Sequence, residues 1–324
     1  MCTAISWCGK HHYFGRNLDL EYVFDERIVI APRNFPFSFR FHPTLSKHYA
    51  MIGTATVADG YPLYYEATNE VGLSIAGLNF PGNAAYLSPR KDKINLAPFE
   101  LIPWILGRCA NLDEARTVLE QTNLVNTPFS GDWPLSPLHW IIADRNGAVV
   151  AEPMADGLHL YDDPIGVLTN NPPFPYHLDH LSAYMALSPR QAKNHFSTTF
   201  PLQPYSNGMG AMGLPGDYSS ASRFIKAAFV KENSHGGETL ESDVVQFFHL
   251  LRAVEMPRGS VIMPDGRYEI TQYTSCCDSD SCVYYYTTYE SSTIHAVAMH
   301  TKKRDGCKLE IYPMLRTCQI QLQN

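Results

Sequence analysis

Short apolar runs rich in β-branched and aromatic residues occupy both ends of the chain. Near the start they span residues 2–8, 13–17 and 27–32, and each run has the length and composition of a β-strand. Similar runs between Tyr268 and Ile320 predict successive antiparallel strands. The pair Asn146-Gly147 between two apolar runs predicts a hairpin. Sheet is therefore expected at both ends of the sequence.

Helical spacing dominates the middle of the chain. Apolar residues recur with a helical period after Asn111, a suitable N-cap with acidic residues following it. Residues 244–251 keep the spacing of one buried helical face, and a third helix is expected from Ser219 or Ser220 to Lys231. Strand runs that flank helical runs, without regular βαβ alternation, favour an α+β fold with mostly antiparallel sheets covered by helices.

Composition and charge narrow the range of partners. The 324 residues contain no low-complexity tract or linker, which favours one large domain over residues 1–324. The net charge is −7 and the Lys and Arg residues are scattered, so no basic footprint for nucleic acid is present. No stretch approaches 18 apolar residues and no signal-like segment opens the chain. We expect a cytoplasmic protein that does not bind a membrane.

The cysteines and the familiar cofactor motifs give no sign of a bound group. Eight cysteines in a long intracellular chain are expected to be free thiols. Cys276, Cys277 and Cys282 do not complete a tetrahedral metal site, and a turn before a strand explains them better. The chain also lacks a phosphate-binding glycine loop, a Gly-x-Ser-x-Gly elbow and a His-Glu-x-x-His helix. No metal and no organic cofactor are expected.

The first two residues form a candidate catalytic device. Cys2 follows the initiator Met1, and removal of Met1 would give Cys2 both a thiol and a free α-amine. Because unperturbed thiols and α-amines titrate near pH 8 to 9, roughly, the amine can serve as general base to its own nucleophile. A hairpin through residues 13–19 would bring Arg16 and Asp19 back beside Cys2, although an exposed surface ion pair explains those two residues equally well.

Several separated motifs identify a family. These motifs occur in order along the whole chain: Met-Cys-Thr-Ala-Ile at 1–5, Tyr-Phe-Gly-Arg-Asn-Leu-Asp-Leu-Glu at 13–21, Ala-Gly-Leu-Asn-Phe-Pro-Gly at 76–82, Val-Leu-Thr-Asn-Asn-Pro-Pro at 167–173, Gly-Leu-Pro-Gly-Asp at 213–217, Ser-Arg-Phe at 222–224 and Thr-Gln-Tyr at 271–273. With these motifs the chain resembles the bile salt hydrolase and penicillin V acylase family in the N-terminal nucleophile hydrolase superfamily.

This resemblance implies a fold and a set of site residues. The fold would be a four-layer αββα sandwich of two mostly antiparallel sheets, with a mature chain starting at Cys2. The implied roles are the nucleophile (Cys2), its polar supports (Arg16, Asp19), a backbone oxyanion donor (Asn79), a side-chain oxyanion donor (Asn170) and a further cation (Arg223). From the residues alone, Asn170 before Asn171-Pro172 is equally a turn. Arg223 opposes the dipole of its helix, so it needs a partner, either a negative site group or Asp217.

The resemblance also implies a substrate. Conjugated bile acids pair an apolar steroid with an amide and an acidic tail, which suits a pocket with apolar walls, here expected from Leu18, Phe24, Phe80 and Phe129. Penicillin V acylase activity is one alternative, and a catalytically silent bile acid binding protein that retains Met1 is another. A thioester intermediate could also be intercepted by an amine. The family resemblance further suggests a homo-oligomer, commonly a tetramer.

Overall fold

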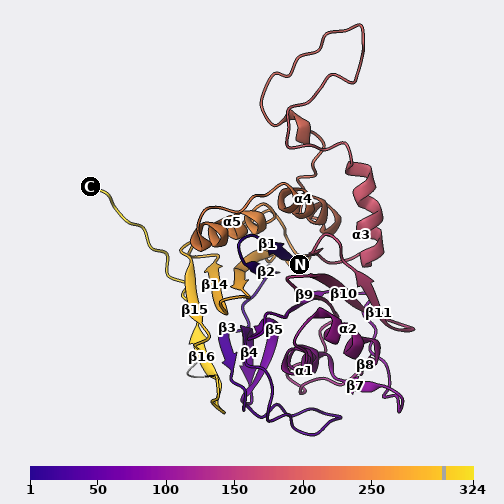
Figure 1. The fold of residues 1–324 in the computed structure, drawn as a ribbon, viewed down its shortest axis with the longest axis vertical. Helices are drawn as coiled ribbons and strands as arrows, with labels where there is room; N and C mark the ends of the chain where they lie inside the picture. The colour runs from indigo at the N-terminus through magenta and orange to yellow at the C-terminus, as the bar shows by residue number, and fades with distance from the viewer. Residues whose placement is uncertain (301–303) are drawn as a thin grey trace.

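Two antiparallel sheets packed against each other form the centre of the molecule (Figure 1). The computed structural model describes residues 1–300 and 304–324. The first sheet has six strands in the order β12-β1-β2-β13-β14-β15. These strands are β1 (Cys2–Cys8), β2 (His12–Leu20), β12 (Val167–Leu168), β13 (Ile270–Asp278), β14 (Val283–Thr288) and β15 (His295–Ala298).

The second sheet has eight strands in the order β11-β10-β9-β6-β5-β4-β3-β16. They are β3 (Arg27–Ala31), β4 (Met51–Ala58), β5 (Tyr61–Asn69), β6 (Ser74–Asn79), β9 (Leu138–Asp144), β10 (Gly147–Met154), β11 (Gly157–Asp162) and β16 (Glu310–Pro313). A small parallel pair, β7 (Ile94–Leu96) and β8 (Thr122–Leu124), lies beside it.

Helices cover the outer face of each sheet (Figure 1). The helices α1 (Leu101–Arg108) and α2 (Leu112–Glu120) pack on the eight-stranded sheet. The six-stranded sheet is covered by α4 (Ser220–Glu232) and α5 (Leu240–Arg252), and α3 (Phe174–Leu181) packs on α4. Short 3-10 turns are η1 (Pro98–Glu100), η2 (Ser182–Tyr184) and η3 (Met209–Ala211). The four-layer αββα sandwich expected from the sequence is thus confirmed.

Central strands are apolar on both faces because each face meets a different layer. In β3, Ile28 and Ile30 belong to the core shared by the two sheets, whereas Val29 and Ala31 belong to the core beneath α1 and α2. This alternation follows from the two-residue repeat of a strand. The many two-sided apolar strands in the sequence therefore require a layer on each side of the sheet.

Several local predictions are confirmed. The Asn111 side chain accepts the N–H of Glu114 at 3.0 Å and caps α2. Gly147 pairs with Asp144 across the predicted hairpin, and α4 begins at Ser220. The sequence patterns did not reveal α1 and α3, because both are short, α1 contains a proline and α3 follows two.

The last predicted strand joins the other sheet. β16 is antiparallel to its neighbour, as predicted, but that neighbour is β3 at the edge of the eight-stranded sheet and not β15. An alternating pattern reports that a strand has a buried face, not which of two sheets it joins. By pairing with β3, β16 supplies hydrogen-bond partners to the backbone groups at that edge of the sheet.

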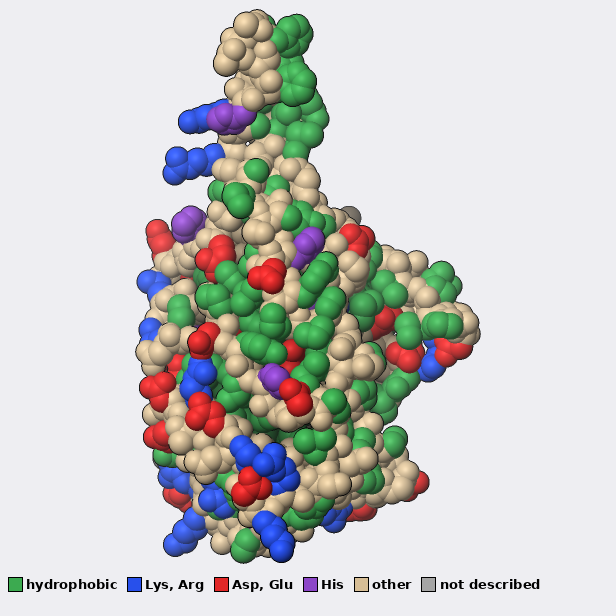
Figure 2. Space-filling model, turned by 90° about the vertical axis from the view of Figure 1, so that its right-hand side faces the viewer, with side chains coloured by type: hydrophobic (Ala, Val, Ile, Leu, Met, Phe, Trp, Pro, Cys, Tyr) green, Lys and Arg blue, Asp and Glu red, His purple; other side chains and the backbone are tan. Residues whose placement is uncertain are grey.

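A narrow arm (residues 185–212) projects from the layer of α3 and α4 (Figure 1). Hydrophobic side chains lie along one edge of this arm in Figure 2. Phe196, Phe200 and Tyr205 are more than half exposed there. Among residues 1–300 and 304–324, no helix has both the length and the apolar character needed to cross a bilayer.

Candidate active site

The site is built around Cys2, the first residue of β1. The β1–β2 hairpin pairs Cys2 with Leu18 and Ala4 with Arg16, which brings Arg16 back to the chain start as predicted. Arg16 Nη2 donates to Cys2 Sγ at 2.5 Å. Both side chains are buried. A guanidinium donor in this position stabilises a thiolate relative to a thiol.

Arg16 also reaches across to the opposite sheet. Its Nη1 donates to the backbone oxygens of Gly77 at 2.6 Å and Tyr65 at 3.3 Å, on β6 and β5. The same nitrogen lies 3.8 Å from Oε2 of Glu66. The guanidinium is therefore fixed between the two sheets, with the thiol on one side and a carboxylate on the other.

Glu66 was not found by sequence analysis. It is fully buried, and the hydroxyls of Tyr273, at 2.7 Å, and Tyr284 donate to its two oxygens. Burial raises the pKa of Glu66, while the charge of Arg16 and the two tyrosine hydroxyls oppose that rise. Its partners come from β13 and β14, so no local motif could reveal the cluster. The carboxylate balances the Arg16 charge within the core.

Asp19 lies beside the chain start, where its side chain and its backbone make separate contacts. Its Oδ1 accepts the Thr271 hydroxyl at 2.6 Å, and its buried Oδ2 has no hydrogen-bond partner among the described residues. Met1 precedes Cys2 in this structure, and its α-amine donates to the Asp19 backbone oxygen at 2.7 Å and to the Glu269 carboxylate. Burial lowers the pKa of this amine. One carboxylate oxygen of Asp19 thus remains free beside the chain start.

Asn170 and Arg223 hold the backbone of Cys2. The Cys2 N–H donates to Asn170 Oδ1 at 2.8 Å, and Asn170 Nδ2 donates to the Asn79 backbone oxygen at 2.6 Å. Arg223 donates to the Cys2 oxygen, to the Thr3 hydroxyl at 2.6 Å and to Asn170 Oδ1 at 2.7 Å. The structure therefore brings together all six residues that the resemblance proposed for the site.

Of the two partners expected for Arg223, Asp217 is wrong, whereas the site carboxylate of Asp19 does act on its charge. The hydrogen-bond partners of Arg223 are neutral oxygens, whereas Asp217 bonds to Ser219 and Ser222 at the start of α4. The pKa of Asp217 is lowered to about 2 by those serine hydrogen bonds. Arg223 is buried and is turned into the site, away from the exposed carboxylate.

A cavity of about 640 Å³ opens beside Cys2. Leu18, Phe24 and Phe129 lie on its wall, as expected. Phe80 does not, and that prediction is corrected: this ring is fully buried and stacks on His139 at 4.3 Å. Lining residues that sequence analysis missed come mainly from α1, β4, β5 and β9 and from the turn before β9: Thr56, Leu63, Tyr64, Tyr65, Phe99, Ile102, Pro134, Leu135, Ser136, Pro137, Leu138 and Trp140.

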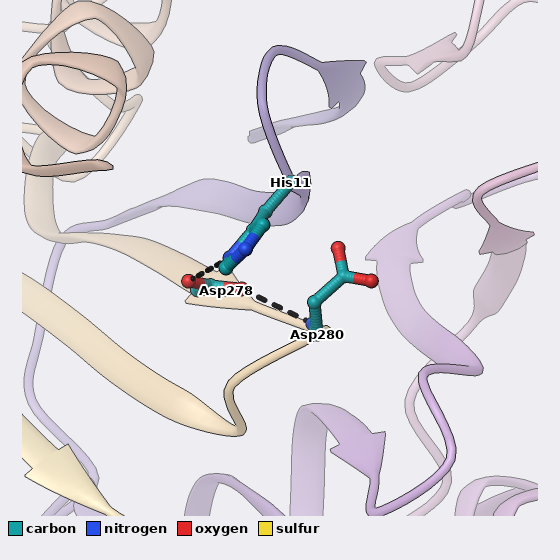
Figure 3. A group of neighbouring side chains, drawn as sticks. All are labelled: His11, Asp278 and Asp280. Atoms are coloured by element: carbon teal, nitrogen blue, oxygen red, sulfur yellow. Dashed lines mark hydrogen bonds and ion pairs between the residues drawn. The ribbon is translucent and has the colours of Figure 1, made fainter. Parts of the chain in front are cut away.

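One group with metal-like spacing occurs among the described residues, at the opposite end of β2 from Leu18 (Figure 3). Its members His11 and Asp278 bond to each other at 2.8 Å. Asp280 accepts the His12 N–H at 2.7 Å and the Arg145 guanidinium at 2.8 Å. The carboxylates of Asp278 and Asp280 are thus already bonded to groups of the protein, including the Arg145 guanidinium. The eight cysteines are free thiols.

Comparison with known proteins places this geometry in a family. A model of the linear amide C–N hydrolases, choloylglycine hydrolase family, matches residues 2–312. A bile salt hydrolase/transferase of Lactiplantibacillus plantarum is 48% identical over the full length of both chains. One of Clostridium perfringens is 36% identical, again over both full lengths. The crystal structure of the C2A mutant of the conjugated bile acid hydrolase from Clostridium perfringens superposes with a TM-score of 0.91 at 35% identity, covering both chains completely.

The αββα architecture with a cysteine at the start of a central strand defines a hydrolase of the N-terminal nucleophile fold. A penicillin V acylase from Agrobacterium tumefaciens shares this fold, with a TM-score of 0.74, over 96% of this chain and 90% of its own, at 18% identity. The chain belongs to the choloylglycine hydrolase family of linear amide C–N hydrolases.

The Arg16–Glu66 pair predicts how charge in the core affects the thiol. Glu66→Gln removes a negative charge close to Arg16 but keeps polar atoms for the tyrosines. With less opposition to the Arg16 charge, Cys2 should form thiolate more readily at low pH. The ratio of iodoacetamide labelling rates at Cys2, measured by mass spectrometry at pH 6 and pH 9, should rise by about three- to tenfold. The control is Glu100→Gln, a buried carboxylate in the other core; an unchanged ratio in Glu66→Gln would contradict the charge argument.

Proposed function

We propose that the protein hydrolyses the amide bond of glycine- or taurine-conjugated bile acids with Cys2 as nucleophile. The observation that carries this proposal is a buried thiol held by Arg16 at the wall of a large cavity with many apolar side chains. The relatives named bile salt hydrolase/transferase and conjugated bile acid hydrolase supply the substrate class.

Removal of Met1 would create the general base. The Cys2 nitrogen, now an amide bonded to Asn170 Oδ1, would become a primary amine next to its own thiol. Burial lowers the pKa of the Met1 amine in these surroundings, and the same effect would favour an uncharged Cys2 amine. The Oδ2 of Asp19, which has no hydrogen-bond partner among the described residues, is available to accept a hydrogen bond from that amine.

The reaction would proceed through a thioester. The Cys2 sulfur attacks the amide carbon and its proton passes to the α-amine, giving a tetrahedral oxyanion. The Asn79 backbone N–H and the Asn170 carboxamide would donate to that oxygen. Collapse breaks the C–N bond as the α-amine protonates the departing nitrogen of glycine or taurine. Water, deprotonated by the same amine, then hydrolyses the thioester and releases the bile acid and the thiol.

The two arginines would have separate tasks. Arg16 contacts the sulfur itself, so it would stabilise negative charge on the nucleophile. Arg223 contacts the Cys2 oxygen and Asn170 Oδ1, so it would orient the nucleophile. It would also keep Asn170 Nδ2 directed toward Asn79, the residue with the other proposed oxyanion donor. Each acts without a metal in this scheme.

The cavity would hold the steroid. Its volume of about 640 Å³ is in the range of sites that enclose small organic ligands. Leu18, Phe24 and Phe129 would contact the apolar ring system, while the amide lies at Cys2. Penicillin V is the alternative acyl donor, because the same nucleophile could attack its linear amide.

Amine transfer is a second candidate activity. Relatives from three organisms are named hydrolase/transferase, and a thioester can be attacked by the amine of an amino acid as well as by water. The acyl group would then pass to nitrogen and regenerate the thiol, with the same residues in the same roles.

A homo-oligomer, specifically a tetramer, is proposed in addition. The arm carries Phe196 and Tyr205 with exposed fractions of 86% and 82%, and exposed apolar patches of this kind mark interaction surfaces. A second copy of the chain is the proposed occupant. The unpaired cysteines support a reducing, cytoplasmic location.

The first test combines a substrate panel with the nucleophile variant. Wild-type protein should release glycine from glycocholate or taurine from taurocholate faster than it cleaves penicillin V, measured as amine release. Cys2→Ala should lower turnover by at least about 10³-fold, because no sulfur remains to form the thioester, with an unchanged circular dichroism spectrum. Intact mass should correspond to a chain without Met1. Normal turnover in Cys2→Ala, or retained Met1 in an active protein, would refute the mechanism.

The second test concerns the cavity wall. Phe24→Ala should raise KM for glycocholate by about tenfold with kcat changed less than threefold, since it removes apolar contact made equally in the ground state and transition state. Tyr176→Ala, an exposed aromatic on α3, is the matched control and should leave both constants unchanged. A fall in kcat alone in Phe24→Ala would argue against a binding role.

The third test concerns assembly. Light scattering after size-exclusion chromatography should give four times the chain mass for the wild type. The double variant Phe196→Asp, Tyr205→Asp should shift the mass downward, because charge in an apolar contact is costly to bury. Ile320→Asp in the equally exposed C-terminal tail should not. A monomeric wild type would contradict the proposed oligomer.

A further inference from the structure

A fully buried histidine links the two segments that carry the proposed oxyanion donors. His139 lies on β9, and its ring stacks on Phe80 with a centroid separation of 4.3 Å and an angle of 4°. Phe80 directly follows Asn79, and β9 pairs with β6 so that Leu78 opposes His139. One face of the imidazole is thus packed against the Asn79 segment in the eight-stranded sheet.

The same ring reaches the other sheet through a hydrogen bond. His139 Nε2 lies 3.0 Å from the backbone oxygen of Thr169, the residue before Asn170. Thr169 follows β12, which pairs with β1 in the six-stranded sheet. The His139 side chain therefore joins the neighbours of Asn79 and Asn170, although Asn79 lies on the eight-stranded sheet and Asn170 follows a strand of the six-stranded sheet.

Glu152 fixes the orientation of this ring. Its Oε1 lies 3.0 Å from His139 Nδ1 and accepts the N–H of Phe174 at 3.0 Å. A carbonyl oxygen can only accept, so Nε2 must carry a hydrogen directed at Thr169. A further proton, shared by His139 and Glu152, then lies between Nδ1 and Oε1. The fully buried ring cannot turn over without breaking its hydrogen bonds to Thr169 and Glu152.

We propose that His139, oriented by Glu152, is a positioning residue that sets the separation between the Asn79 backbone donor and the Asn170 side-chain donor. The inference rests on the proposed function, because it assigns a task within the same oxyanion hole. His177 and Ser220 contact Asn170 at 2.9 and 2.8 Å from the side of α3 and α4, whereas His139 ties this segment to the opposite sheet.

The consequence is kinetic. Oxyanion donors bind strongly only when charge has developed on the substrate oxygen, so a shift in their separation affects the chemical step more than substrate binding. Attack by Cys2 on iodoacetamide forms no oxyanion. Loss of the His139 contacts should therefore lower kcat while leaving KM and thiol labelling largely intact.

The experiment uses His139→Leu and His139→Gln in the full-length enzyme. His139→Leu should lower kcat for glycocholate by about 30- to 300-fold, with KM within threefold and the labelling rate of Cys2 within twofold of wild type. His139→Gln should recover about tenfold of the loss, because a carboxamide can donate to the Thr169 oxygen. The control is His12→Leu, a fully buried histidine bonded to Ser6 and Ser279, which should keep normal kcat.

Several outcomes would overturn the proposal. Unchanged kcat in His139→Leu would do so, as would an equal loss of kcat and thiol labelling, which indicates general disorder of the site. If His139→Leu does not fold, Phe80→Leu carries the test, with an expected fall in kcat of about tenfold and normal labelling. Failure of wild-type protein to cleave any conjugated bile acid or penicillin V would refute the proposed function, whereas normal wild-type turnover with an unaffected His139→Leu refutes this inference alone.

Discussion

The Arg16 guanidinium, buried between the two sheets, is the constraint on which the site depends. A charge removed from water must be compensated by partners held at fixed positions. Here the partners are the Cys2 sulfur, the Gly77 and Tyr65 carbonyls and the Glu66 carboxylate. Because these groups come from both sheets, the αββα packing and the environment of the thiol cannot be separated.

Arg223 is a second buried guanidinium, and its charge is compensated by a different set of groups. Its hydrogen bonds go to neutral oxygens, and the surrounding burial lowers its pKa. Two buried cations thus flank one residue, and a carboxylate acts on each of them, Glu66 on Arg16 and Asp19 on Arg223. The two guanidinium groups place hydrogen-bond donors around Cys2, which suits a reaction that develops negative charge on sulfur and then on oxygen.

The local elements were predictable where the signal lay within a few residues. The hairpin that returns Arg16 to Cys2, the Asn111 cap and the start of α4 follow from alternation, capping chemistry and helical spacing. Cys2, Arg16 and Asp19 were candidates from the residues themselves. Asn79, Asn170 and Arg223 could be assigned to the site only through the family resemblance, since Asn170 or Arg223 alone has an ordinary structural explanation. Glu66 and His139 left no signal, because each contacts partners from several separate segments of the chain. The same limitation explains why the partner strand of β16 could not be predicted and why Phe80 was wrongly placed on the cavity wall.

The burial of the chain start within the central sheet restricts how the polypeptide can be extended. Cys2 is 3% exposed and its N–H donates to Asn170. Under the proposed mechanism, a fusion partner or affinity tag joined before Cys2 would keep this nitrogen a peptide amide and so remove the proposed general base. The C-terminal tail, in contrast, extends away from both sheets (Figure 1). Attachments, immobilisation chemistry and reporter domains therefore belong at the far end of the chain.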